Sequence, residues 1–248
     1  TRNVLTVNTF SLLHLNNNKQ TINNMQRTIE KTDTELQKDV MSELKYDPSV
    51  KVSDIGVLAK DGTVTLNGYA TSYNEKWEAV HATKRVAGVK AIADDIEIQL
   101  PASYHRTDTD IAAAAINQIE WSTTIPNGTV QATVRDGWIT LDGQVEWWYQ
   151  KNAAGGLVKQ MAGVKGVTNS ISISPKVTKH EVEKDIKSAF KRSAMLDAEH
   201  IRVETSGNNV ILHGQVRNYS EYDEAERVAW SEAGVSSVDN RLEVDWMF

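Results

Sequence analysis

Carboxylate side chains are the residues of this chain most able to do acid–base chemistry, and they are plentiful but dispersed. They gather at Asp94 and Asp95, at Asp142 and Glu146, and between residues 221 and 226. A general acid needs an apolar setting that raises the pKa of its carboxyl group, and none of these acids lies within an apolar run. The serines lack a nucleophile-elbow context, and no glycine-rich phosphate loop follows a predicted strand. We therefore expect no catalytic residue and no cofactor.

Histidines and Asp-Gly pairs are the candidates for metal binding. The histidines are scattered, with no two at ligand spacing on one predicted element; they are His14, His81, His105, His180, His200 and His213. Asp61-Gly62 and Asp136-Gly137 look like fragments of a calcium loop, but the further spaced acids and the closing glutamate of such a loop are missing. Asp-Gly favours the two-residue turn of a β-hairpin. We interpret both pairs as turns and expect no metal site.

The two Asp-Gly pairs belong to a stretch that occurs three times. The copies are residues 61–68, 136–143 and 207–214, and in each a turn dipeptide precedes apolar residues at alternate positions. This alternation is the period of a half-buried strand. Each copy therefore predicts a β-hairpin whose second strand ends in the final glycine.

Glycines keep the register of the repeat over a longer distance. A second glycine follows each strand-end glycine by twenty positions, and the six are Gly68, Gly88, Gly143, Gly163, Gly214 and Gly234. We predict structural roles for all six, with the later glycine of each pair capping a helix that begins at an aromatic residue. Upstream of each hairpin, apolar residues at a spacing of four predict a first helix. Downstream, a second alternating run predicts a third strand.

These elements predict an α+β fold of three tandem two-layer units in the order helix-strand-strand-helix-strand (αββαβ). Each unit is expected to hold a three-stranded mixed sheet with two helices on one face. The predicted units span residues 32–100, 107–174 and 178–246. Residues 1–31 contain only a broken apolar stretch, so we predict a disordered N-terminal extension that is a poor secretory signal.

Composition narrows the classes of partner. A formal net charge of −6 argues against nucleic acid, because binding a phosphate backbone calls for a basic face. No apolar run approaches the ~18 residues that a transmembrane helix needs. The chain has no cysteine, which excludes disulfides and thiolate chemistry but does not distinguish a reducing cytosol from an envelope compartment.

The repeated unit resembles the BON domain, the bacterial OsmY and nodulation module. The resemblance rests on the Leu-x-Gly strand end at Leu66 and Gly68, on Gly88 with the valine that follows it, and on the closing alternating strand. It covers Thr32 to about Asp245 as three copies. It implies a non-catalytic osmotic or envelope stress protein that binds phospholipid surfaces or another envelope partner. It also implies a periplasmic location, whereas the lack of a readable signal peptide indicates the cytoplasm.

One aromatic cluster departs from the repeat. Trp147, Trp148 and Tyr149 lie where the middle hairpin should lead into its helix, and only Trp148 has aromatic counterparts in the other copies. Amphipathic rings suit a membrane interface or a partner pocket, so these three are candidate membrane- or partner-binding residues. Two alternatives stay open: the rings could fill the contact between adjacent repeats, or the chain could be a cytosolic protein–protein interaction scaffold that touches no lipid. Gly155 and Gly156 in the same predicted helix either permit close approach of a neighbouring unit or leave the helix pliable.

Overall fold

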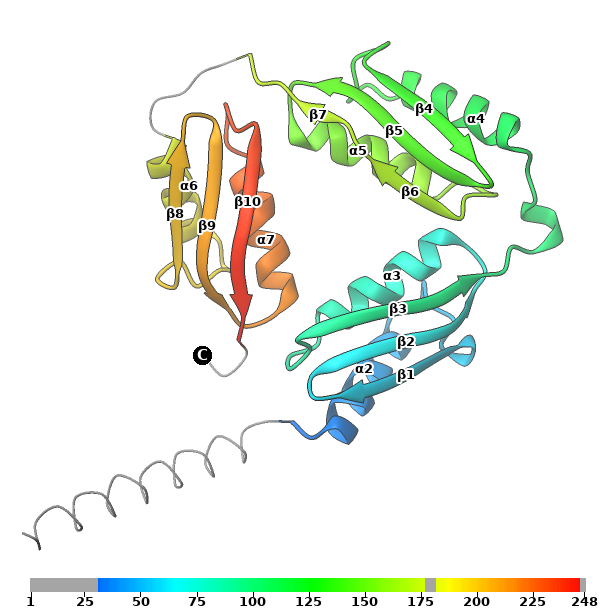
Figure 1. Ribbon diagram of the computed structural model, residues 1–248, viewed down its shortest axis with the longest axis horizontal. Helices are drawn as coiled ribbons and strands as arrows, with labels where there is room; N and C mark the ends of the chain where they lie inside the picture. Colours follow the sequence, from blue (N-terminus) through cyan, green and yellow to red (C-terminus); the bar gives the residue numbers. More distant parts are fainter. Residues whose placement is uncertain (1–30, 177–181, 246–248) are drawn as a thin grey trace, which may run out of the picture.

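The computed structural model describes residues 31–176 and 182–245, so nearly all of the predicted N-terminal extension and the start of the third predicted unit lie outside it. The described chain forms three units of similar build: unit 1 (Asp33–Ile98), unit 2 (Asp108–Ile173) and unit 3 (Val182–Val244). Figure 1 shows three separate sheets, each with its own pair of helices. The predicted α+β class, with three tandem αββαβ units, is confirmed.

The order of elements is the same in each unit. Unit 1 consists of α2 (Asp33–Tyr46), the 3₁₀ helix η1 (Val52–Asp54), β1 (Ile55–Lys60), β2 (Thr63–Ala70), α3 (Tyr73–Lys84) and β3 (Ala91–Ile98). After a linker with η2 (Ala102–Tyr104), unit 2 consists of α4 (Asp108–Glu120), β4 (Val130–Arg135), β5 (Trp138–Val145), α5 (Trp148–Lys159), β6 (Gly166–Asn169) and β7 (Ser172–Ile173). Unit 3 consists of α6 (Val182–Arg192), β8 (Ile201–Ser206), β9 (Asn209–Val216), α7 (Tyr219–Trp230) and β10 (Ser237–Val244).

The hairpin's second strand is central in every sheet. It pairs antiparallel with the first strand and parallel with the last, giving the orders β1-β2-β3, β4-β5-β6 and β8-β9-β10. In unit 2 the closing strand is split into β6 and β7, both of which pair with β5. The register is unchanged across the split, because Trp138 faces Gly166 and Gln144 faces Ser172. The sheet of unit 2 therefore follows the same plan as the other two.

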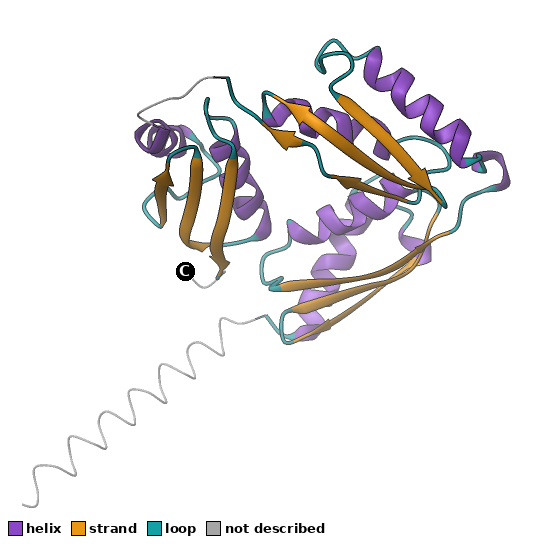
Figure 2. Cartoon of the chain, turned by 45° about the horizontal axis from the view of Figure 1, so that its top comes forward, coloured by secondary structure: helices purple, strands orange, loops and turns teal. Residues whose placement is uncertain are grey.

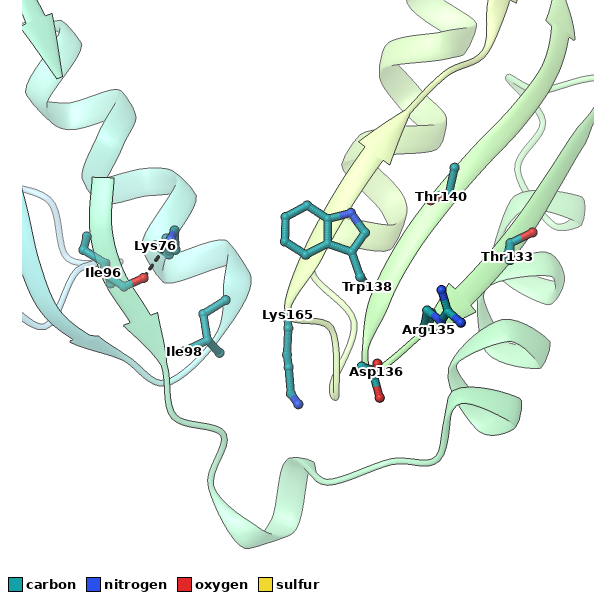
Figure 3. A pocket seen from close by; sticks show the side chains of 9 residues that line it. All are labelled: Lys76, Ile96, Ile98, Thr133, Arg135, Asp136, Trp138, Thr140 and Lys165. Atoms are coloured by element: carbon teal, nitrogen blue, oxygen red, sulfur yellow. Dashed lines mark hydrogen bonds between the residues drawn. The ribbon is translucent and has the colours of Figure 1, made fainter. Parts of the chain in front are cut away.

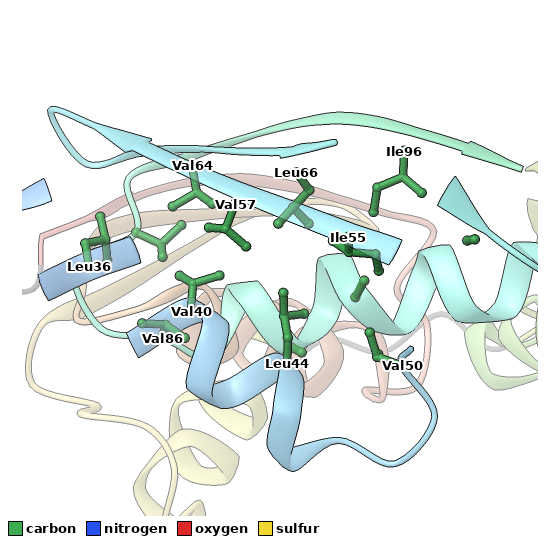
Figure 4. Close-up of a cluster of buried hydrophobic side chains, with 14 residues drawn as sticks. Leu36, Val40, Leu44, Val50, Ile55, Val57, Val64, Leu66, Val86 and Ile96 are labelled. Carbon is green, nitrogen blue, oxygen red and sulfur yellow. The ribbon is translucent and has the colours of Figure 1, made fainter. Parts of the chain in front are cut away.

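Each unit buries its own hydrophobic core between its sheet and its helices. In unit 1, Leu36, Val40 and Leu44 of α2 pack with Val64 and Leu66 of β2, as Figure 4 shows. Fully burying such a side chain contributes about 1.5–3 kcal/mol. The stripe at a spacing of four thus decides which face of the first helix turns inward. Its counterparts in units 2 and 3 are Ile111, Ala115, Ile119, Val182, Ile186 and Phe190.

The first glycine of each repeat does not end its strand, contrary to the prediction. β2, β5 and β9 continue two residues past Gly68, Gly143 and Gly214 because the closing strand still pairs there, with Gly68 facing Ile96. The φ angles of these three glycines are +108°, +138° and +126°. A Cβ at Gly68 would lie 2.1 Å from the carbonyl oxygen of Asp54. Glycine is therefore required here by both the positive φ and the neighbouring carbonyl oxygen.

The second glycine of each repeat does not cap the second helix, which also corrects the prediction. α3 ends at Lys84, and its C-cap Arg85 keeps a right-handed conformation and donates its N–H back into the last turn. Gly88 lies further on, in the turn that leads to β3, with φ +97°. Gly163 and Gly234, with φ +91° and +90°, lie equally far beyond α5 and α7. The left-handed residue is needed by the turn after the helix.

A polar residue is buried at the same position of each second helix. These residues are Glu75, Gln150 and Glu221, which are 5%, 6% and 3% exposed. Glu75 accepts hydrogen bonds from the backbone N–H groups of Lys51 and Thr71, both at 2.8 Å. Glu221 accepts in the same way from Asp197 and Arg217, at 2.9 and 2.8 Å. The carboxylate thus ties the loop before the hairpin to the segment that enters the helix.

Unit 2 differs at both ends of this contact. Gln150 accepts from the backbone N–H groups of Glu146 and Trp147. The position of Lys51 is occupied by Pro126, which has no N–H to donate. A carboxylate accepts at both oxygens, whereas an amide accepts at one. The exchange of glutamate for glutamine therefore matches the loss of one donor.

The closing strand is an edge strand in every sheet, and side chains of its own unit cap part of that edge. In unit 1 the N–H of Ile96 donates to Oδ1 of Asp94 at 3.2 Å, and its carbonyl accepts from Nζ of Lys76 at 2.7 Å. Asn169 and Asn240, the equivalents of Asp94, accept the N–H two residues further on in units 2 and 3. These backbone groups are therefore unavailable to an incoming strand.

Candidate functional site

The aromatic cluster found in the sequence lies at one end of unit 2. Val130 at the start of β4 pairs with Gly143 near the end of β5, so the loop after α4 and the start of α5 lie at the same end of the unit (Figure 1). The residue that follows α4 is Trp121, which is 89% exposed. We call this end the aromatic tip and define it by Trp121, Trp147 and Tyr149.

Trp147 and Tyr149 contact each other within the tip. Their ring centroids are 6.4 Å apart, and the ring planes meet at 24°. Tyr149 is 53% exposed, while Trp147 and Trp148 are partly buried. The N–H of Trp147 donates to Gln150, which fixes the backbone just before α5 begins. The sequence thus identified a pair of rings that the fold holds together at the surface.

Trp121 was missed by the sequence reasoning. Its counterparts are Tyr46 in unit 1, which is 83% exposed, and Arg192 in unit 3, so an exposed residue is usual at this position. A signal was nevertheless present, because α4 has no lysine or arginine, unlike α2 and α6. Ala113 and Ala114 form part of its exposed surface. After the uncharged middle of this helix and Glu120 comes Trp121, the most exposed large hydrophobic side chain among the residues that the structure describes.

The loop that begins at Trp121 carries no charge of its own, although the exposed Glu120 comes directly before it. Residues 121–129 contain no charged side chain. The carboxylate of Glu146 pairs with Nζ of Lys176 at 3.0 Å. Exposed rings among hydroxyl and amide groups suit a lipid–water interface better than an ion-binding site.

A groove of about 530 Å³ lies between units 1 and 2 (Figure 3). Ile96 and Ile98 line it from β3, and Trp138 lines it from β5. Trp138 lies over Gly166, where a Cβ would come within 2.3 Å of the ring, and its Nε1 donates to the hydroxyl of Thr168 at 2.8 Å. The indole therefore fills the place of a missing side chain on the sheet.

The charged side chains that line the groove are few and mostly basic. Its Lys76 is held by Asp94 at 3.2 Å, and Asp136 is the one carboxylate among the residues that line it. No hydrogen bond or ion pair joins the carboxylate of Asp136 to a hydroxyl or amine among the other lining residues, so the contact that would activate a nucleophile is not formed. Across the parts of the chain that the structure describes, no three acidic or histidine side chains come together in a way that could hold a metal ion. None of the helices in those parts is both long and apolar enough to cross a bilayer.

A smaller cavity of about 310 Å³ lies where α3 passes α5. Tyr73 and Trp77 of α3 line one side, and Gly155 and Gly156 of α5 line the other. A Cβ at Gly156 would meet nothing within 4 Å. Gly156 therefore faces open space, whereas a Cβ at Gly155 would lie 3.0 Å from Nδ2 of Asn169 in the same unit. Neither glycine is needed for the close approach of unit 1.

His81 borders this contact. It stacks on Trp77, with ring centroids 3.3 Å apart. Burial lowers the pKa of His81, and the nearby cations Lys84 and Lys159 lower it further, although the carbonyl of Trp77 and the carboxylate of Asp223 act in the opposite direction. The neutral imidazole is thus the form that the fold favours.

Comparison with known proteins follows this geometry. Residues 32–99, 107–175 and 178–245 each match the profile of the BON domain family. The chain therefore belongs to the BON domain family, as the resemblance in its sequence indicated. It is similar to the osmotically-inducible protein Y of Escherichia coli (strain K12), with 27% identity over 127 residues, which is 50% of this chain and 63% of that protein.

Among solved structures the chain is similar to CdsD, a structural protein of the type III secretion system of Chlamydia trachomatis. The identity is 14%, with 82% of this chain and 89% of the other covered and a TM-score of 0.23. It is also similar to the periplasmic domain of PrgH, with 10% identity, 77% and 95% coverage and a TM-score of 0.21. TM-scores this low do not indicate a shared overall fold.

Proposed function

We propose that this protein is a non-enzymatic component of the osmotic or envelope stress response that attaches to phospholipid membrane surfaces through the aromatic tip of unit 2. The BON family membership and the similarity to an osmotically inducible protein support the physiological setting. The observation that carries the membrane surface is Trp121, which is 89% exposed at the end of a helix without lysine or arginine.

The aromatic tip has the composition of an interfacial anchor. Tryptophan and tyrosine favour the headgroup region of a bilayer, where the ring is apolar and its N–H or O–H stays hydrated. Moving one large apolar side chain out of water is worth about 1.5–3 kcal/mol. Two or three rings therefore give a reversible attachment, of the order of one lipid chain. Because residues 121–129 carry no charge, the binding should depend little on anionic lipid and on salt.

Co-sedimentation with phosphatidylcholine vesicles tests this proposal. We expect Trp121→Ala, and the double variant Trp147→Ala with Tyr149→Ala, to weaken binding about tenfold each, which corresponds to about 1.4 kcal/mol. The matched control is Tyr46→Ala, because Tyr46 is 83% exposed at the same position of unit 1. Its binding should equal that of the wild type. Equal binding by all variants, or no binding by the wild type, would remove the proposed role of the tip.

The alternative function is a protein–protein interaction scaffold without lipid binding. An exposed tryptophan at the same end of the unit as a stacked Trp–Tyr pair also has the chemistry of a protein hot spot. Affinity capture with the wild type and with Trp121→Ala distinguishes the two functions. A soluble protein that is retained only by the wild type, together with no sedimentation on vesicles, supports the scaffold.

A further inference from the structure

Two of the contacts between units are made by the aromatic residue that begins the second helix, which we call the anchor of its unit. Tyr73, the first residue of α3, packs against the core of unit 2, and its hydroxyl is hydrogen-bonded to the backbone of Val167. Tyr219, the first residue of α7, packs against the core of unit 1, and its hydroxyl donates to the carbonyl of Lys90 at 2.6 Å. In both cases an aromatic residue at the start of the second helix reaches the beginning of the next unit's closing strand.

A second contact accompanies each anchor, one helical turn further along. Nζ of Lys159 lies 3.0 Å from the ring centroid of Trp77. At the equivalent positions, Nζ of Lys84 pairs with Asp223 at 2.9 Å. The two contacts use equivalent positions of the repeat. Trp77 and Asp223 each lie nine residues after the first repeat glycine of their unit, and Lys159 and Lys84 each lie sixteen residues after it. Unit 1 is thus anchored on unit 2, and unit 3 is anchored on unit 1, through one type of heterologous contact.

The equivalent aromatic residue of unit 2 does not pack on the core of a neighbouring unit. By the same register it is Trp148, with Asn152 as its second contact, and unit 3 offers Ser236 and Trp230 at the receiving positions. Trp148 does not belong to the residues packed on any of the three cores. Among the described residues, Trp148 and Asn152 make no hydrogen bond, ion pair or ring contact with unit 3, and the hydrogen bonds of Trp230 and Ser236 stay within unit 3.

The start of α5 in unit 2 lies near the segment of unit 3 that corresponds to the packing sites of Tyr73 and Tyr219. Figures 1 and 2 show the start of α5 beside the end of α7 and the start of β10 in both views. Only a short linker separates units 2 and 3, which places the two segments at a high effective concentration. Their chemistry matches the contact of Tyr219, because the indole N–H of Trp148 is a donor like the hydroxyl of Tyr219, and the carbonyl of Ser236 corresponds to that of Lys90.

We propose that Trp148 docks at the start of β10, with Asn152 against Trp230, and closes the three units of one chain into a ring with pseudo-threefold symmetry. If each of three units packs its aromatic residue on the next unit, the heterologous contact occurs three times and closes a ring. The proposal assigns Trp148 to the contact between units and leaves Trp147 and Tyr149 at the surface. It does not depend on membrane binding.

Cysteine cross-linking tests the proposed contact. The chain has no cysteine, so only introduced thiols react with a short bismaleimide. The test pair is Asn152→Cys with Trp230→Cys, and the positive control is Lys84→Cys with Asp223→Cys. We expect the test pair to cross-link within one chain at a rate comparable with that of the control, unchanged on dilution.

A negative pair and two further variants make the result specific. Asn152→Cys with Arg192→Cys, whose second position is exposed at the end of α6, should not react. Adding Trp148→Ala to the test pair should slow cross-linking about tenfold. Adding Tyr149→Ala should leave the rate unchanged.

The contact is wrong if the test pair stays unlinked while the positive control reacts, or if it links two different chains. Trp230 is partly buried, so its replacement could disturb unit 3. A second pair, Asn152→Cys with Ser231→Cys, keeps Trp230 and uses the exposed neighbouring position. Failure of both pairs to link within one chain overturns the proposal.

Discussion

Replacing Glu75 by glutamine tests the buried carboxylate that accepts two backbone N–H groups in unit 1, as Glu221 does in unit 3. The carboxylate accepts the N–H groups of Lys51 and Thr71 at 2.8 Å and the hydroxyl of Thr71 at 2.7 Å. In glutamine one oxygen becomes an NH₂ group, which would face a backbone donor at a site that is 5% exposed. A hydrogen bond to a charged group is worth about 1.5–3 kcal/mol, and a buried unpaired donor costs about 1–3 kcal/mol. We therefore expect Glu75→Gln to destabilise unit 1 by about 2–4 kcal/mol.

Hydrogen exchange of the whole chain, followed by mass spectrometry, measures this loss locally. Slowly exchanging amides of residues 33–98 should lose protection by about 30- to 1000-fold, because each 1.4 kcal/mol is a factor of ten. Amides in units 2 and 3 serve as internal controls and should change far less. A loss of only a few tenths of a kcal/mol in unit 1 would refute the reasoning.

Lys51→Pro supplies the matched test, because unit 2 naturally combines Pro126 with Gln150. In the wild-type background this substitution removes a hydrogen bond to the carboxylate. In the Glu75→Gln background it removes the donor that has lost its acceptor, so it should cost about 1–2 kcal/mol less. Equal costs in the two backgrounds would show that Glu75 and Lys51 are not coupled.

Three further predictions concern single positions. Gly68→Ala should cost unit 1 more than about 3 kcal/mol, since the new Cβ would clash with a carbonyl oxygen at a φ of +108°. In thermal unfolding its loss should exceed that of Gly128→Ala, where φ is +75° but the space is open, and equal losses would contradict the steric argument. Gly156→Ala should stabilise α5 by about 0.5–1 kcal/mol in urea unfolding, because its Cβ meets nothing within 4 Å; a loss of stability would show that the open space is needed. Because the folded chain lowers the pKa of His81, the unfolded chain binds the proton more readily, so the stability present above the unfolded value of about 6.5 declines as the pH falls below it. His81→Gln should flatten this decline in unfolding curves between about pH 7 and 5, and an unchanged slope would exclude His81 as its source.

The architecture was predictable because local patterns and their threefold recurrence agree. The stripe of Leu36, Val40 and Leu44 and the alternation within each hairpin give the same elements that the structure contains. The roles of the glycines were not predictable in the same way. A recurring glycine indicates a left-handed backbone, but the reason at Gly68 is the carbonyl of Asp54 on the neighbouring strand. That contact is set by strand pairing, which a local pattern does not contain.

The candidate site was predictable only where it breaks the repeat. Trp147 and Tyr149 stood out because the other copies have small polar residues at those positions. Trp121 did not stand out, since Tyr46 occupies the same position in unit 1. Its significance depends on the topology, which brings the end of α4 to the start of α5. The proposed role of Trp148 between units follows only from the structure, in which the equivalent residues Tyr73 and Tyr219 pack on the cores of neighbouring units.

The capped closing strands bear on how three near-copies coexist in one polypeptide. Covalent tethering keeps similar sheets at high mutual concentration, which favours strand exchange and misassembly between domains. Asp94, Asn169 and Asn240 each occupy a backbone donor that such an exchange would need. Each closing edge therefore offers one donor fewer to a neighbour's strand. Fewer open donors on these edges lower the tendency of three tethered copies to merge into one aggregation-prone sheet.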